Sequence, residues 1–177
     1  MAGATPDYAL FADALDYPGA GWAAVLARMD LAADPSGSVA AFAAAARELP
    51  LGALQEIYTA TFDMQPDMTL STGFHLFGDD YQRSDFLVRL SGILRARQFA
   101  YGAELPDHAC LLLRFLAQAA GGPEAEGLAE ECLAPALARV AARLETQNAP
   151  ACSPYRHLLR AITAALPPPT LYHGASA

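Results

Sequence analysis

Apolar residues recur at helical spacing along most of this chain, and proline or glycine interrupts each run. Tyr8, Phe11, Ala12 and Leu15 follow the i, i+3, i+4, i+7 pattern of one helix face, and Pro18-Gly19 ends that run. No segment shows the alternation of apolar and polar residues that is typical of a half-buried strand. Ala and Leu dominate an apolar content of 54%, and these residues cost least to hold in a helix. The sequence therefore predicts an all-α fold, a single globular bundle of about eight or nine short helices.

The prolines and glycines also place the expected elements along the chain. Ser38 is a candidate N-cap, Pro106 occupies a favoured first helical position, and Pro135 is expected to kink or split its helix. We expect one all-helical domain over residues 1–166 and a Pro-rich C-terminal tail, extended or disordered, over 167–177. The expected helices cover about residues 7–17, 22–29, 39–48, 51–63, 70–77, 81–101, 106–120, 124–148 and 155–166.

The charge balance limits the kind of partner. Eleven basic residues, all Arg, face 19 acidic residues, and the net charge is −8. Such a chain is a poor nucleic-acid binder, because attraction to phosphate dominates that affinity. An acidic surface suits a basic partner, although it also serves simply to keep an apolar-rich protein in solution. The N-terminus lacks a basic region before an apolar run, and no apolar stretch reaches 18 residues, so we expect a cytoplasmic protein without stable membrane association.

Residue patterns for metal binding or catalysis are weak. Cys110, Cys132 and Cys152 form no C-x-x-C pair, and the first two lie in apolar segments that favour burial. His75 and Asp79 are four residues apart, but Gly78 interrupts any helix between them and no third ligand lies nearby. The alternative is that His75 packs while Asp79 caps the next helix. Without Lys there is no P-loop, and no G-x-S-x-G appears, so we expect neither an enzyme nor a metal or cofactor site.

Polar residues instead gather in three strings between apolar helices: Thr61-Phe62-Asp63, then His75, Gly78, Asp79 and Arg83, then Glu104-Leu105-Pro106-Asp107-His108. With Pro106 in the first helical position, Asp107 would lie in the first turn, where its charge suits the helix dipole. His108 would lie on the same helix face as Leu112 and Phe115, at the N-terminal end of that helix. A core histidine satisfied by a neighbour is the alternative for His108.

These strings, in this order, resemble the TorD/NarJ family of redox-enzyme maturation chaperones, and within it the NarJ branch (nitrate reductase delta subunit, or molybdenum cofactor assembly chaperone). The resemblance covers about a third of the chain. It implies a TorD/NarJ-like helical fold and a cytoplasmic chaperone that assists molybdenum cofactor insertion. The implied partner is the catalytic subunit of a molybdopterin oxidoreductase, nitrate reductase-like and of the DMSO reductase family, bound through an N-terminal or twin-arginine-like segment. The implied peptide-binding residues are His75, Gly78, Asp79, Arg83, Glu104, Asp107 and His108, with Tyr58 and Phe62 from the preceding helix.

Two other functions fit the same residues. A generic helical adaptor or regulator would need no link to molybdoenzymes, and a helical enzyme would need a site built from scattered residues. Both a monomer and a homodimer stay open. We expect the second and third strings to lie close together and line one groove. The alternative is two independent helix caps at opposite ends of the helix expected over 81–101.

Overall fold

The computed structural model describes residues 6–32, 34, 36–119, 121–146 and 153–170, and all regular structure in these residues is helical. The all-α prediction is confirmed. Joined where they follow one another without a break, the described segments make nine helices besides the single 3₁₀ turn η2. The elements are α1 (Tyr8–Leu15), α2 (Trp22–Met29), α3 (Ser38–Arg47), α4 (Leu51–Tyr58), η1 (Thr59–Asp63), η2 (Pro66–Met68), α5 (Thr72–Phe77), α6 (Gln82–Ala96), α7 (Ala109–Ala119), α8 (Pro123–Gly127), η3 (Leu128–Leu133), α9 (Ala134–Thr146) and α10 (Tyr155–Ala165).

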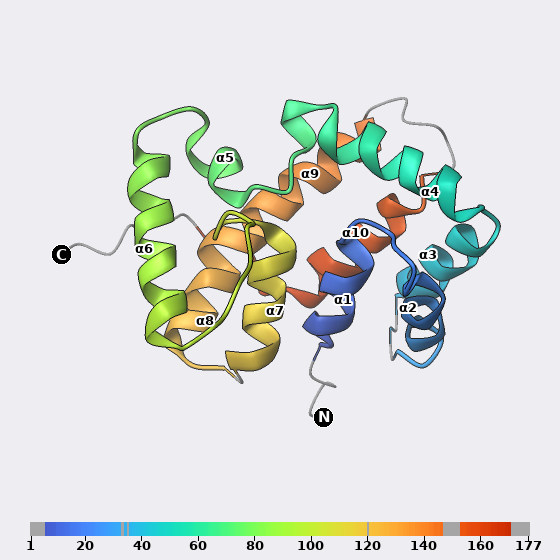
Figure 1. The fold of residues 1–177 in the computed structure, drawn as a ribbon, viewed down its shortest axis with the longest axis horizontal. Helices are drawn as coiled ribbons and strands as arrows, with labels where there is room; N and C mark the ends of the chain where they lie inside the picture. The colour runs from blue at the N-terminus through green and yellow to red at the C-terminus, as the bar shows by residue number, and fades with distance from the viewer. Residues whose placement is uncertain (1–5, 33, 35, 120, 147–152, 171–177) are drawn as a thin grey trace.

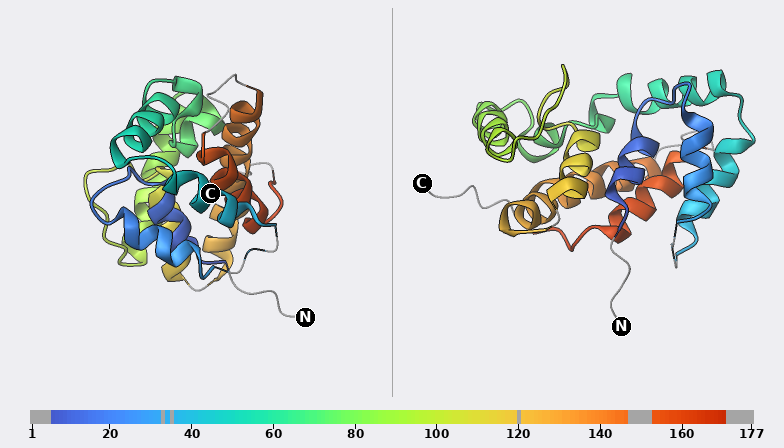
Figure 2. Two further views of the ribbon diagram at one scale, coloured as in Figure 1. Left: turned by 90° about the vertical axis from the view of Figure 1, so that its right-hand side faces the viewer. Right: turned by 60° about the horizontal axis from the view of Figure 1, so that its bottom comes forward.

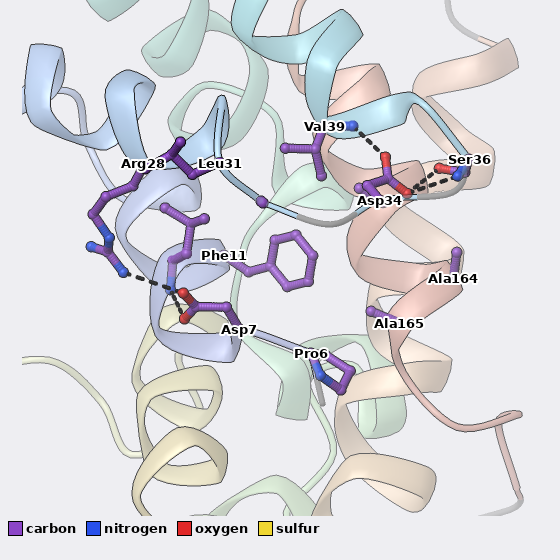
Figure 3. A pocket seen from close by; sticks show the side chains of 13 residues that line it. Pro6, Asp7, Phe11, Arg28, Leu31, Asp34, Ser36, Val39, Ala164 and Ala165 are labelled. Atoms are coloured by element: carbon purple, nitrogen blue, oxygen red, sulfur yellow. Dashed lines mark hydrogen bonds and ion pairs between the residues drawn. The ribbon is translucent and has the colours of Figure 1, made fainter. Parts of the chain in front are cut away.

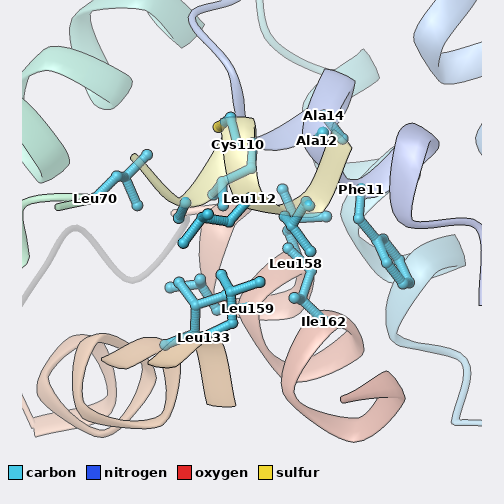
Figure 4. Packing of buried hydrophobic residues seen from close by; sticks show 14 of the residues in the cluster. Phe11, Ala12, Ala14, Leu70, Cys110, Leu112, Leu133, Leu158, Leu159 and Ile162 are labelled. Atoms are coloured by element: carbon cyan, nitrogen blue, oxygen red, sulfur yellow. The ribbon is translucent and has the colours of Figure 1, made fainter. Parts of the chain in front are cut away.

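Helix α10 lies in the middle of the molecule and packs against α1, α3 and α9 (Figure 1). Helix α1 packs in turn on α7, while α5 contacts both α6 and α9. In the right-hand view of Figure 2, α6 lies at one end of an elongated bundle and α2 and α3 lie at the other. The apolar faces of the central helices meet in one continuous core, in which Leu112, Leu158, Leu159 and Ile162 are completely buried (Figure 4).

Two acidic side chains fix the first helices. Asp7 caps α1, because its carboxylate accepts a hydrogen bond from the backbone N–H of Leu10 at 2.9 Å. For α3 the prediction was wrong: Ser38 is the first helical residue. Asp34 accepts the N–H of Val39 at 2.7 Å instead. The physical reason is the turn at Gly37 (φ 72°), which lets Asp34 reach over the helix end.

Helix α6 is shorter than predicted and ends at Ala96, not near Tyr101. Its last turn forms a Schellman motif, in which the N–H of Phe99 donates to the carbonyl of Leu94 and that of Gln98 to Arg95, both at 2.9 Å. Gln98 adopts the left-handed conformation (φ 53°) that this motif requires. The chain then turns Phe99 inward, where its ring meets Phe115 edge-on at 5.5 Å. Tertiary packing therefore ends the helix without a glycine.

The proline within the long C-terminal helix is accommodated by a wide turn. Segments α8, η3 and α9 follow one another without a break, and η3 has π-helical geometry up to the residue two before Pro135. Proline lacks an N–H and its ring clashes with the carbonyl four residues earlier, so a wider turn relieves the conflict. The helix is therefore widened before Pro135 and not split, as one of the two expectations had it.

Helix α7 begins at Ala109, three residues later than predicted. Residues 105–108 form a turn instead, and an isolated antiparallel bridge joins His108 to Ser71. Of the expected tail, residues 167–170 are described and non-helical, with the N–H of Thr170 donating to the carbonyl of Glu130 at 3.0 Å; residues 171–177 lie outside the described part. No helix among the described residues is both long and apolar enough to cross a bilayer.

Candidate functional site

The second and third polar strings meet around the buried carboxylate of Asp107. This side chain is fully buried, and its Oδ2 accepts hydrogen bonds from the hydroxyl of Ser71 and from the N–H of Gly73 at 3.1 Å. Arg83 reaches the same group, with its Nε 3.9 Å from Oδ2 and its Nη2 donating to the hydroxyl of Ser71 at 3.1 Å. Backbone hydrogen bonds from Thr72 to Asp107 and from Ala109 to Leu70 complete the junction. The contact between the two strings is therefore confirmed for Arg83 and Asp107.

The expected position of Asp107 is nevertheless wrong. We expected a first-turn residue at an open helix end, but α7 starts beyond it and its side chain is covered by the start of α5. A carboxylate without contact to solvent cannot touch a partner peptide. Asp107 instead fixes α5 against the turn before α7.

Gly73 makes this junction possible, and sequence reasoning missed it. A Cβ atom at this position would lie 2.9 Å from Asp107 Oδ2 and 3.0 Å from a ring carbon of Phe86. The backbone of α5 approaches the carboxylate this closely because nothing projects from Gly73. No signal in the sequence distinguishes this glycine from those that end helices.

On its other side α5 borders a solvent-open hollow of about 360 Å³ against α9. His75 and Gly78 contribute from α5 and its end, Asp67 from η2, and Arg139 and Arg143 from α9. Gly78 ends α5 with a positive φ of 63° and a ψ of −136°, a conformation that favours glycine. The hollow therefore contains two of the residues predicted from the sequence and two arginines that were not predicted.

His75 is held neutral at the wall of this hollow. Its Nε2 lies 2.7 Å from the carbonyl oxygen of Thr69, and because a carbonyl only accepts, this nitrogen carries the proton. Burial lowers the pKa of the His75 imidazole, and the charge of Arg139 lowers it further. The hydrogen bond to Thr69 and the carboxylate of Asp67 act in the opposite direction but do not outweigh burial.

The two arginines of α9 are four residues apart and share one helix face. Arg143 forms an ion pair with Asp67. Arg139 donates to the backbone carbonyl of His75 and forms no ion pair with any described residue. The hollow thus presents two guanidinium groups against one carboxylate.

The remaining residues of the strings lie at the surface near these groups. Asp79 and Glu104 are exposed and have neither a hydrogen bond nor an ion pair within the described part of the chain. Asp80, rather than Asp79, caps α6, since its carboxylate accepts the N–H of Gln82 at 2.9 Å. His108 is half-buried, and its carbonyl accepts the N–H of Leu112 at 3.0 Å. Acidic side chains therefore flank the loop that follows Gly78.

Tyr58 and Phe62 lie inside the core, with only 5% and 3% of their surface exposed. Their rings meet at 5.1 Å, and both contact the ring of Tyr155, at 5.7 and 5.2 Å. Phe62 lies in η1, four residues after Tyr58, and both side chains face inward. Rings that are this deeply buried cannot contact a partner, so we assign both a supporting role in the core.

A larger cavity, of about 640 Å³, lies between α1, α10 and the segment before α3 and contains none of the predicted residues (Figure 3). Phe11, Leu31 and Val39 give it an apolar lining. Its charged groups are already paired: Arg28 lies 3.7 Å from Asp7, and Asp34 caps α3. Among the described residues no three His, Cys, Asp or Glu side chains gather as a metal would need.

A comparison with protein families complements this geometry. The family model described as nitrate reductase delta subunit matches residues 28–156, which include all nine residues predicted for the site. No curated protein matches the chain.

Proposed function

The chain belongs to the nitrate reductase delta subunit family, and on that premise we propose that it binds the N-terminal segment of a molybdoenzyme catalytic subunit and holds that subunit open for insertion of the molybdenum cofactor. Membership supports a chaperone role in molybdoenzyme maturation, without catalysis by this chain. A cytoplasmic location fits that role, because the cofactor is to be inserted before the client is docked or exported.

The observation that carries the proposal is the hollow between α5 and α9, beside the family-like string of His75, Gly78, Asp79 and Arg83. Gly78 leaves open space where a side chain would project, so an extended backbone can approach closely. Exposed Asp79 and Asp80 follow it directly and suit the basic part of a leader segment. Behind this surface, the buried junction of Arg83 with Asp107 keeps α5 in place.

A binding experiment tests the partner. The purified protein should bind a synthetic peptide that copies the first few tens of residues of the client subunit, and the affinity should fall as salt is raised, because screening weakens the attraction between opposite charges. Calorimetry that detects neither heat nor competition at micromolar concentrations would contradict the proposal.

Two variants locate the binding. Gly78→Val places a branched side chain on the open backbone and also strains the positive-φ turn, so it should weaken peptide binding at least tenfold. Ala164→Trp fills the cavity between α1 and α10 and should leave peptide binding unchanged. If Ala164→Trp weakened peptide binding and Gly78→Val did not, the binding site would be the larger cavity, and the proposed chaperone role would be unaffected.

A gene deletion separates a chaperone from an adaptor or an enzyme. The client subunit should still be made, but with little molybdenum and little activity. A fully active, metal-replete oxidoreductase in the deletion strain would rule out the chaperone role.

A further inference from the structure

The charges that line the hollow have the opposite sign to the protein as a whole. The chain carries a net charge of −8, yet Arg139 and Arg143 face a single carboxylate, that of Asp67, and His75 beside them is neutral. A leader segment that entered arginine first would meet like charges here. The hollow itself therefore selects something other than the basic part of a partner.

Of the two arginines that line the hollow, Arg139 is the one without a carboxylate partner among the described residues. Eight of the eleven arginines pair with carboxylates: Arg28, Arg47, Arg83, Arg97, Arg114, Arg143, Arg156 and Arg160. Arg139 has only the backbone carbonyl of His75 as a partner among the described residues. A guanidinium carries five N–H donors in a planar fork that matches a carboxylate. Most of these N–H donors have no partner among the described residues.

We infer that the hollow between α5 and α9 binds a carboxylate side chain of the client segment, through the guanidinium of Arg139. The inference rests on the proposed function and specifies its chemistry. Asp67 pairs with Arg143, so Arg139 is the guanidinium of the hollow that has no carboxylate partner among the described residues. The client segment would then place an Asp or Glu in the hollow and its basic residues over Asp79 and Asp80, so that the spacing of opposite charges fixes its register.

A double-mutant cycle with the client peptide tests the contact. Changing the critical Glu or Asp of the peptide to its amide should lower affinity about tenfold, as expected for a charge-assisted hydrogen bond. The same change should have almost no effect on binding to Arg139→Gln. Arg95→Gln is the matched control, because Arg95 is exposed on α6, has no ion pair among the described residues and lies outside the hollow. If the effects of the peptide change and of Arg139→Gln on the binding free energy were additive, the inference would be overturned.

A gain of affinity gives an independent test. Asp67→Asn removes the competing carboxylate and frees Arg143, so binding of the acidic peptide should strengthen several-fold. Unchanged or weaker binding, in a variant with an unaltered melting temperature, would count against a carboxylate site.

A small probe keeps the inference separable from the proposed function. A capped six-residue peptide with one Glu should shift the NMR signals of Arg139 Nε–H and the Gly78 amide at millimolar concentration, and its Gln and Arg counterparts should not. If the acidic probe binds and no client peptide does, the carboxylate site stands and the client is misassigned. If the client binds and the probe shifts neither signal, the chaperone role stands and the carboxylate site is wrong.

Discussion

Asp107 belongs to a string that resembles the family's binding motif, yet its side chain is buried and stabilises the fold. Its buried carboxylate accepts hydrogen bonds from the Ser71 hydroxyl and the Gly73 N–H, and it lies 3.9 Å from the Nε of the partly exposed Arg83. Asp107→Ala should lower the free energy of unfolding by about 2–3 kcal/mol, since it leaves these two donors without an acceptor and Arg83 without its ion pair. Urea unfolding measures this, and Glu104→Ala, on an exposed side chain, should stay within about 0.5 kcal/mol. Equal effects of the two changes would contradict the assignment.

Gly73 depends on the same junction. Gly73→Ala would normally favour a helix, but here the added Cβ would lie within 3.0 Å of Asp107 and Phe86. We expect a loss of about 1–2 kcal/mol, because overpacking outweighs the helix preference. Gly92→Ala, in α6 with open space around the added atom, should stabilise the protein by up to about 1 kcal/mol. Thermal unfolding of the two variants would contradict this if both were stabilised.

His75 gives the site a pH dependence with a definite sign. Its folded pKa lies below that of the unfolded chain, so the unfolded state binds the proton more tightly. The stability that the neutral ring contributes is present above pH 6.5 and is lost as the pH falls below it, towards the folded pKa. An NMR titration should show the low pKa directly. Arg139→Gln should raise it, because the guanidinium charge is one of its causes; an unchanged value would place Arg139 too far away to matter.

At the scale of elements, the end of α6 makes the sharpest prediction. Gln98 occupies the left-handed position of a Schellman motif, where a side chain costs about 1 kcal/mol relative to glycine. Gln98→Gly should therefore stabilise the protein by about 0.5–1 kcal/mol, and Ala96→Gly, still within the helix, should destabilise it by a similar amount. Denaturant midpoints measure both, and a loss of stability in the first variant would mean that the motif is not formed.

The same helix shows what the sequence could and could not predict. Apolar spacing located the buried faces, because Phe86, Leu90 and Leu94 repeat with the helical period. It could not locate the end of α6, which depends on Phe99 packing against Phe115, or the start of α7, which depends on pairing with residues 70–72. Likewise, Arg139 and Arg143 were visible as an i, i+4 pair, but only the packing of α9 on α5 places them beside His75. The ends of these helices and the position of the two arginines depend on contacts between segments that are distant in sequence. Local sequence patterns do not contain that information.

At the scale of the whole molecule, one core extends from α2 and α3 through α10 to α6 and α7. We therefore expect residues 6–170 to unfold in a single cooperative transition, as the prediction of one domain requires. Trp22 fluorescence reports one end of the bundle and far-UV circular dichroism the whole. The two transitions should coincide, and Leu158→Ala in the centre should shift both by the same amount. Separate midpoints would divide the chain into two domains.

The π-helical segment η3 has a consequence for the site that lies two turns further along. An α-helix advances about 100° per residue, and a wider π turn absorbs one additional residue without changing the phase of the helix that follows. Deleting one residue from Leu128–Leu133 should therefore restore α-helical winding and leave Arg139 and Arg143 facing α5. Deleting one residue between Pro135 and Arg139, where no wide turn can absorb the change, would instead rotate both guanidinium groups away from α5 by about that angle. The π segment thus makes one stretch of this helix tolerant of a change in length that the rest of the helix is not.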